Sequence, residues 1–125
     1  MSKRIPKPRA AQPNREPVGS VEVANEVVQM IAAMAAEEVD GVAGTDPLAA
    51  RRAGDWLRHR TAHRGVKVEL DSERSLHLDV FITVNANVEF HRVAQKVQAN
   101  VAEAVGKMLG MDVAEVNVYV TNVAF

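Results

Sequence analysis

The spacing of apolar residues switches repeatedly along this chain between a helical period and a strand period. From Asn25 to Val39 apolar residues recur every three or four positions, which predicts a helix with one buried stripe. The same period returns from Val93 to Met108. Gly110 is placed to end this second helix, and Gly41 is placed after the first as a residue of left-handed backbone conformation. Two amphipathic helices therefore need an apolar surface to cover.

Strands supply that surface. Apolar residues alternate with polar or charged ones over residues 66–70, 76–84 and 116–121. The first two segments flank the turn-forming residues 71–75 and predict a β-hairpin, and the third predicts a strand near residue 125. Residues 21–23 are expected to form a further short strand ahead of the first helix.

The resulting element order is (β)αββαβ. Every apolar stripe is buried when two helices pack on one face of a small, largely antiparallel sheet of three to four strands. We therefore predict an α+β fold in the form of a two-layer sandwich, and both ferredoxin-like and KH-like arrangements are compatible with this order.

The chain has 125 residues, enough for one core, and we expect one domain over residues 19–125. Residues 1–18 hold four of the five prolines, and this composition predicts a disordered tail. The tail is a candidate electrostatic contact for an acidic partner or an anionic membrane surface, at about 1 kcal/mol per basic residue. Its basic residues are Lys3, Arg4, Lys7, Arg9 and Arg15.

Charge and cysteine content exclude several classes of function. The tail holds five basic residues and one acid, so residues 19–125 hold 10 of the 15 basic residues and 15 of the 16 acids. This acidic domain argues against general nucleic-acid binding. The absence of cysteine excludes disulfides and thiolate zinc sites. No segment approaches the roughly 20 apolar residues that span a bilayer, and no secretory leader is evident, so we expect a cytoplasmic protein.

Residues 43–64 are expected to form a long, arginine-rich loop in which residues 48–57 fit a short amphipathic helix. The single tryptophan lies there among cations, a combination that suits protein contacts. Two aromatic residues are expected on the sheet face away from the helices. The candidate protein-binding residues are Arg51, Arg52, Trp56, Arg58, Arg60, Phe81 and Tyr119.

No residue pattern indicates catalysis. His59 and His63 are four apart, which would suit a metal on a helix, but the glutamate of zinc proteases is missing between them. His77 and His91 have no visible acidic partner in the sequence, and Asp71 with Glu73 falls in the predicted turn. We expect no enzymatic activity, no cofactor, no metal and no small-molecule substrate.

The order and spacing of several segments resemble the alkaline-shock-protein family of bacteria, which takes part in the envelope stress response. The match runs over about residues 19–123. Its segments include Val21-Glu22-Val23, Glu26-Val27-Val28, Glu38-Val39-Asp40-Gly41-Val42-Ala43-Gly44, Gly65-Val66-Lys67-Val68, Val93-Ala94-Gln95-Lys96-Val97-Gln98 and Val116-Asn117-Val118. Ala24 and Phe90-His91 depart from the family pattern, and the basic tail and the arginine-rich segment are not part of it.

The resemblance implies a cytoplasmic protein of cell-envelope homeostasis that binds proteins, self-associates, and is held peripherally at the inner face of the cell membrane by a partner such as a small membrane-anchoring protein. It implies no catalytic residues and no cofactor. The alternative is a small KH-like nucleic-acid-binding domain, because Gly41-Val42-Ala43-Gly44 has the GxxG spacing of the KH loop. Val42 and Ala43 are apolar, whereas that loop is normally basic, so a helix cap followed by a chain reversal is the favoured interpretation.

Overall fold

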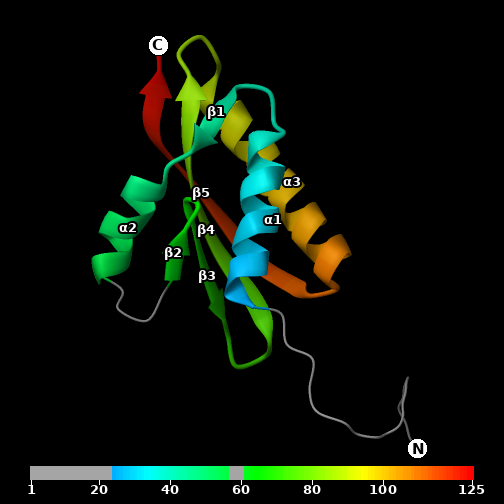
Figure 1. The fold of residues 1–125 in the computed structure, drawn as a ribbon. Helices are drawn as coiled ribbons and strands as arrows, with labels where there is room; N and C mark the ends of the chain where they lie inside the picture. Colours follow the sequence, from blue (N-terminus) through cyan, green and yellow to red (C-terminus); the bar gives the residue numbers. More distant parts are fainter. Residues whose placement is uncertain (1–23, 57–60) are drawn as a thin grey trace, which may run out of the picture.

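The computed structural model describes the backbone of residues 24–56 and 61–125 (Figure 1). Within these ranges it describes the side chains of residues 24–52 and 64–125. The described elements, in chain order, are α1 (Asn25–Glu37), β1 (Val42–Thr45), α2 (Pro47–Trp56), β2 (Thr61–His63), β3 (Val66–Leu70), β4 (Ser75–Asn85), α3 (Phe90–Leu109) and β5 (Asp112–Ala124). The predicted strand at residues 21–23 and the tail at residues 1–18 lie outside the described residues.

Strand β4 is the centre of the sheet. Strand β5 runs parallel to it along one edge, from Ser75↔Asp112 to Asn85↔Ala124. The other edge of β4 is shared by two antiparallel strands, β3 beside its first half and β1 beside its second half. Strand β2 pairs with the outer side of β3. Three of the four strand pairs are antiparallel, so the sheet is largely antiparallel, as predicted.

The change of partner on β4 takes place at Phe81. Its N–H donates to the carbonyl oxygen of Gly65 at 2.9 Å, and its carbonyl oxygen accepts from the N–H of Asp46 at 2.7 Å. Gly65 has φ of +77°, and a Cβ there would lie 2.8 Å from the nitrogen of Asp46. A glycine is therefore required where the two strands meet on one edge.

The core lies between one face of this sheet and the pair α1 and α3, which Figure 1 shows side by side. Alternate β4 residues point into it, as the period of two predicts. The fully buried core side chains include Leu78, Val80, Ile82 and Val84 of β4 and Val97, Val101 and Val105 of α3. This arrangement confirms the predicted α+β sandwich with two helices on one face.

The segment predicted as a long loop differs from expectation. Residues 43–64 contain most of β1, the whole of α2 and the whole of β2, so the described sheet has five strands rather than three or four. The short amphipathic helix proposed within residues 48–57 is confirmed as α2. Figure 1 shows α2 on the opposite side of the sheet from α1 and α3, so the second sheet face is partly covered as well. Short strands cannot be predicted from the spacing of apolar residues, because three or four residues are too few to show a clear period.

The glycines at the helix ends behave largely as predicted. Gly110 has φ of +64° and caps α3 in the left-handed conformation. Gly41 also has positive φ, at +100°, but α1 ends earlier with Glu38 as a right-handed C-cap. A Cβ on Gly41 would lie 2.8 Å from Cγ2 of Val93 on α3. The absence of a Cβ at Gly41 is thus needed for packing against α3 as well as for the backbone turn.

No helix among the described residues is long and apolar enough to cross a membrane.

Candidate functional site

The candidate site is the sheet face opposite α1 and α3, here called the open face. Three neighbouring strands contribute the side chains that alternate with the core residues. Strand pairing brings them together in rows: Glu69, His77 and Glu115; Lys67, Asp79 and Asn117; and then Phe81 beside Tyr119. The open face therefore combines one aromatic pair with a band of polar and charged groups.

The aromatic pair is stacked. The ring centroids of Phe81 and Tyr119 are 5.0 Å apart with an interplanar angle of 22°. Lys67 Nζ lies 5.6 Å from the Phe81 ring centroid, an arrangement in which the ring quadrupole attracts the ammonium. Phe81 is only 7% exposed, whereas Tyr119 is 44% exposed. Of the two aromatic residues predicted as contact residues, Tyr119 has the accessible ring, and the buried ring of Phe81 stacks against it.

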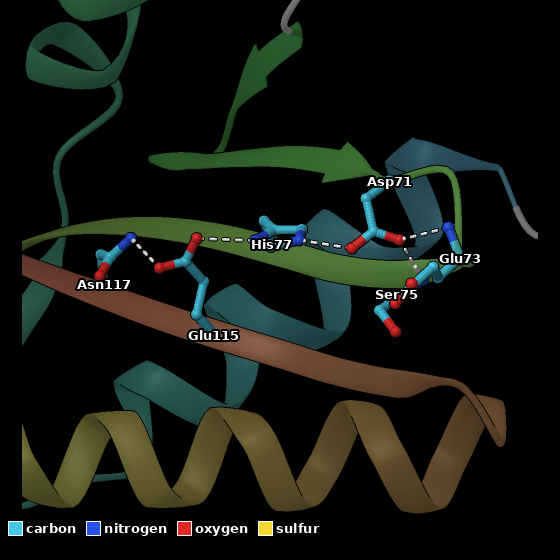
Figure 2. A network of polar contacts seen from close by, with 6 residues as sticks. All are labelled: Asp71, Glu73, Ser75, His77, Glu115 and Asn117. Atoms are coloured by element: carbon cyan, nitrogen blue, oxygen red, sulfur yellow. Dashed lines mark hydrogen bonds and ion pairs between the residues drawn. The ribbon is translucent and has the colours of Figure 1, made fainter.

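A histidine joins two distant acids on the same face (Figure 2). Nδ1 of His77 lies 2.6 Å from Oε1 of Glu115, and Nε2 lies 2.7 Å from Oδ2 of Asp71. Both ring nitrogens can donate at once only in the imidazolium form. His77 thus fastens the β3–β4 turn to β5. This network was missed because Glu115 lies 38 residues from His77 in the sequence, and the parallel pairing of β4 with β5 brings the two residues together.

The other contacts of the network hold the acids in place. Oδ1 of Asp71 accepts the backbone N–H of Glu73 at 2.8 Å and that of Ser75 at 3.0 Å. Nδ2 of Asn117 donates to Oε2 of Glu115 at 3.3 Å and to Oδ1 of Asp79 at 3.1 Å. The carboxylate of Asp71 therefore stabilises the β3–β4 turn through backbone hydrogen bonds of the Asx type and also contacts His77.

These contacts shift two pKa values in opposite directions. The hydrogen bond to Glu115, followed by that to Asp71, raises the pKa of His77 above 6.5. The backbone hydrogen bond from Ser75, followed by the contact with His77, lowers the pKa of Asp71 below 3.8. Each partner favours the charged form of the other. The geometry is that of a structural clamp, since both ring nitrogens are already engaged.

No group of three or more histidine and carboxylate side chains in the described parts of the chain is placed to hold a metal ion. The residue pair considered for a metal does not share a helix: His63 belongs to β2, and His59 lies outside the described residues. The GxxG segment also differs from a KH loop. Val42–Thr45 form β1 and pair with β4, so these residues are not a loop between two helices.

The arginine-rich segment is only partly visible. Arg51 and Arg52 are exposed on α2, and Trp56 is the last residue of that helix. The side chain of Trp56 and all of Arg58 and Arg60 lie outside what the structure describes, as do the tail residues Lys3, Arg4, Lys7, Arg9 and Arg15. Their roles in binding stay predictions.

Sequence reasoning also missed the group that positions α2. Oδ1 of Asp46 accepts the N–H of Ala49 at 3.1 Å, and Oδ2 accepts the hydroxyl of Thr121 at 2.8 Å. The first contact is an N-cap, and Pro47 follows at the favoured first helical position. Asp46 thereby ties α2 to β5 across the open face. The dipeptide Asp46-Pro47 is a helix-start signal that could have located this helix.

Known proteins similar to this chain agree with the fold and its family. Two proteins of Bacillus subtilis, both uncharacterized, are 32% identical: YqhY over 108 residues, 86% of this chain and 79% of its own length, and YloU over 111 residues, 87% and 92% respectively. Among solved structures, a variant of the MamM CTD superposes with a TM-score of 0.50 at 19% identity, covering 82% of this chain and all of that one. This structural likeness shows a shared fold only.

The family model that matches residues 13–125 is that of alkaline shock protein 23, described as having a cell envelope-related function. The matched segment contains every described helix and strand, and the resemblance inferred from the sequence is confirmed. This chain belongs to the alkaline shock protein 23 family.

Proposed function

We propose that this chain is a non-enzymatic, self-associating scaffold of the cell envelope, which binds other proteins and is recruited to the inner face of the cell membrane by a membrane-anchoring partner. The observation that carries the proposal is the open face. Its histidine is clamped between two acids rather than free for chemistry, and its exposed Tyr119 rests on a rigid aromatic base. Tyrosine of this kind is enriched at protein interfaces.

Two exposed cations next to the open face extend the surface. Arg51 and Arg52 project from α2, the helix that packs over the same side of the sheet (Figure 1). Arginine is the charged residue most favoured in interfaces because its planar group can form paired hydrogen bonds with carboxylates. An acidic segment of a partner protein therefore fits beside α2.

The test is in-cell cross-linking of the tagged chain, followed by membrane fractionation and identification of the captured proteins. Arg51→Ala with Arg52→Ala is expected to reduce capture of a membrane-protein partner several-fold. The matched control is Arg92→Ala with Lys96→Ala, which removes the same charge from exposed positions of α3 and should leave capture unchanged. A chain lacking residues 1–18 tests the tail separately.

Recovery of the chain with a small integral membrane protein supports the proposal. Recovery only in the fraction without membranes, together with RNA released by moderate salt, would overturn it in favour of the nucleic-acid alternative, because phosphate-driven binding falls steeply with salt.

A further inference from the structure

Strand β5 lies at the edge of the described sheet. It pairs with β4 over its whole length, and no other described strand pairs with it. One of its outward backbone groups already has a substitute partner: Nε2 of Gln98 on α3 donates to the carbonyl oxygen of Val116 at 2.9 Å. Because backbone groups alternate along a strand, Val118 and Val120 direct theirs to the same edge as Val116.

The middle of the edge lacks the usual protection against pairing. Exposed edges are commonly blocked by charged residues, proline or bulges. From Val116 to Ala124 the strand has no charged residue, no proline and no glycine. Its two irregularities lie beside Ala114 and Thr121, and residues 115–120 between them pair regularly with β4. A regular, uncharged stretch of edge is therefore available.

Space for another strand exists beside this edge. A shallow groove of about 460 Å³ lies between α3 and the first half of β5. On the helix side it is lined by Gln95, Gln98, Ala99 and Ala102, so two alanines and two uncharged polar side chains face the position that an added strand would take. Gln98 would have to rotate, and its contact with Val116 would be replaced by a backbone hydrogen bond.

We propose that a second copy of this chain occupies the edge, with β5 of each copy pairing antiparallel about a two-fold axis at Val118. This inference rests on the self-association in the proposed function and locates its interface. The register places Val116 beside Val120 of the other copy and Asn117 beside its Tyr119. Both acids of β5, Asp112 and Glu115, then face the uncharged half of the opposite strand, so no like charges meet. With a two-fold axis, the same edge of each copy pairs with the other, so the outward backbone groups of both copies are hydrogen-bonded through one kind of surface.

The register makes a prediction about charge at Tyr119. On the open face, its diagonal neighbours across the axis are Glu115 and Tyr119 of the other copy. Tyr119→Glu would gather four carboxylates around the axis, whereas Tyr119→Lys would gather two carboxylates and two cations there. Both substitutions remove the same ring from Phe81 and put an unbranched charged side chain in its place, so they form a pair of opposite charge.

The experiment is analytical ultracentrifugation of the full chain and both variants over a concentration series, with folding checked by circular dichroism. Tyr119→Glu is expected to raise the dimer dissociation constant at least about tenfold over Tyr119→Lys, and about 1 M salt should reduce this difference. A dimer indifferent to the sign of the charge would overturn this interface while leaving self-association intact.

A wild-type chain that stays monomeric at every concentration would overturn the inference and the self-association together, but not membrane recruitment, which the fractionation measures. A dimer that forms only after residues 1–23 have been deleted would mean that the chain's own N-terminal segment blocks the edge. The inference would then fail for the full chain. Should both Tyr119 variants unfold, Val118→Pro removes one outward N–H from the edge and must weaken the dimer if the register is correct.

Discussion

At the scale of single residues, His77 shows how the fold gives a side chain its surroundings. Asp71 precedes it by six positions and Glu115 follows by 38, yet both contact its ring within 2.7 Å. Two further acids flank it on the same face, since Glu69 is its neighbour on β3 and Asp79 lies two residues along β4. The His77 ring thus contacts two carboxylates, and two more stand at neighbouring positions of the same face.

Protonation of His77 is therefore expected to stabilise the fold. Because its folded-state pKa is raised above 6.5, its contribution to the free energy of unfolding is complete below about pH 6.5 and is lost as the pH rises through the folded-state pKa. The pKa of Asp71 is lowered, so its contribution is present above its ordinary value of 3.8 and is lost as the pH falls through the lowered pKa. The clamp is strongest between these limits.

His77→Gln should consequently lower the Tm more at about pH 6 than at about pH 9, because glutamine carries no charge to lose. Thermal unfolding of both chains at the two pH values measures this difference. His91→Gln, at an exposed position in the first turn of α3, is the control and should have little effect at either pH. An equal loss of Tm at both pH values for His77→Gln would contradict the clamp.

At the scale of elements, the elements with long, regular periods were predicted and the short ones were not. Helices α1 and α3 and strands β3 and β4 lie close to the predicted spans because each shows its period over several residues. Strand β5 was predicted from the alternation over residues 116–121, but it extends from Asp112 to Ala124. Strands β1 and β2 have four and three residues, and their pairing partners create them. Helix α2 was expected only as a possibility within a loop, and Asp46 defines where it begins.

Asp46 is expected to control the stability of α2. Asp46→Ala should cost about 0.5–2 kcal/mol of free energy of unfolding, since the N-cap contact with Ala49 and the tie to Thr121 are both lost. Asp46→Asn keeps an oxygen that can accept from Ala49, and should retain most of this stability. Urea unfolding gives the magnitudes, and hydrogen exchange of the α2 amides should show local opening in the alanine variant alone. Equal exchange in both variants would argue against the cap.

At the scale of the whole molecule, stability comes from one core between the sheet and the pair α1 and α3. Leu78 is fully buried at the centre of β4, whereas Leu48 on α2 is 50% exposed. Leu78→Ala should lower the free energy of unfolding by about 2–5 kcal/mol through lost burial and the cavity left behind. Leu48→Ala makes the same chemical change at the surface and should cost less than about 0.5 kcal/mol. Urea unfolding at one fixed protein concentration compares them.

The open face could be only partly predicted from the sequence. The alternation along β4 and β5 placed Phe81 and Tyr119 on the face away from α1 and α3, and the structure agrees. The alternation did not predict that Lys67 would be only 2% exposed, with its ammonium held over the Phe81 ring. Exposure depends on what packs above a side chain, and a local period of two carries no information about that.

The sequence by itself determined the family, the α+β class, the two helical faces and the alternating strands, because these follow from local spacing of apolar residues and from segments that resemble relatives. Only the tertiary structure decided that β5 runs parallel to β4 and that β1 and β3 share one edge. The His77 clamp and the position of β5 at the edge of the described sheet follow from that arrangement. Strand order depends on contacts between residues far apart in the chain, and local periodicity cannot encode them.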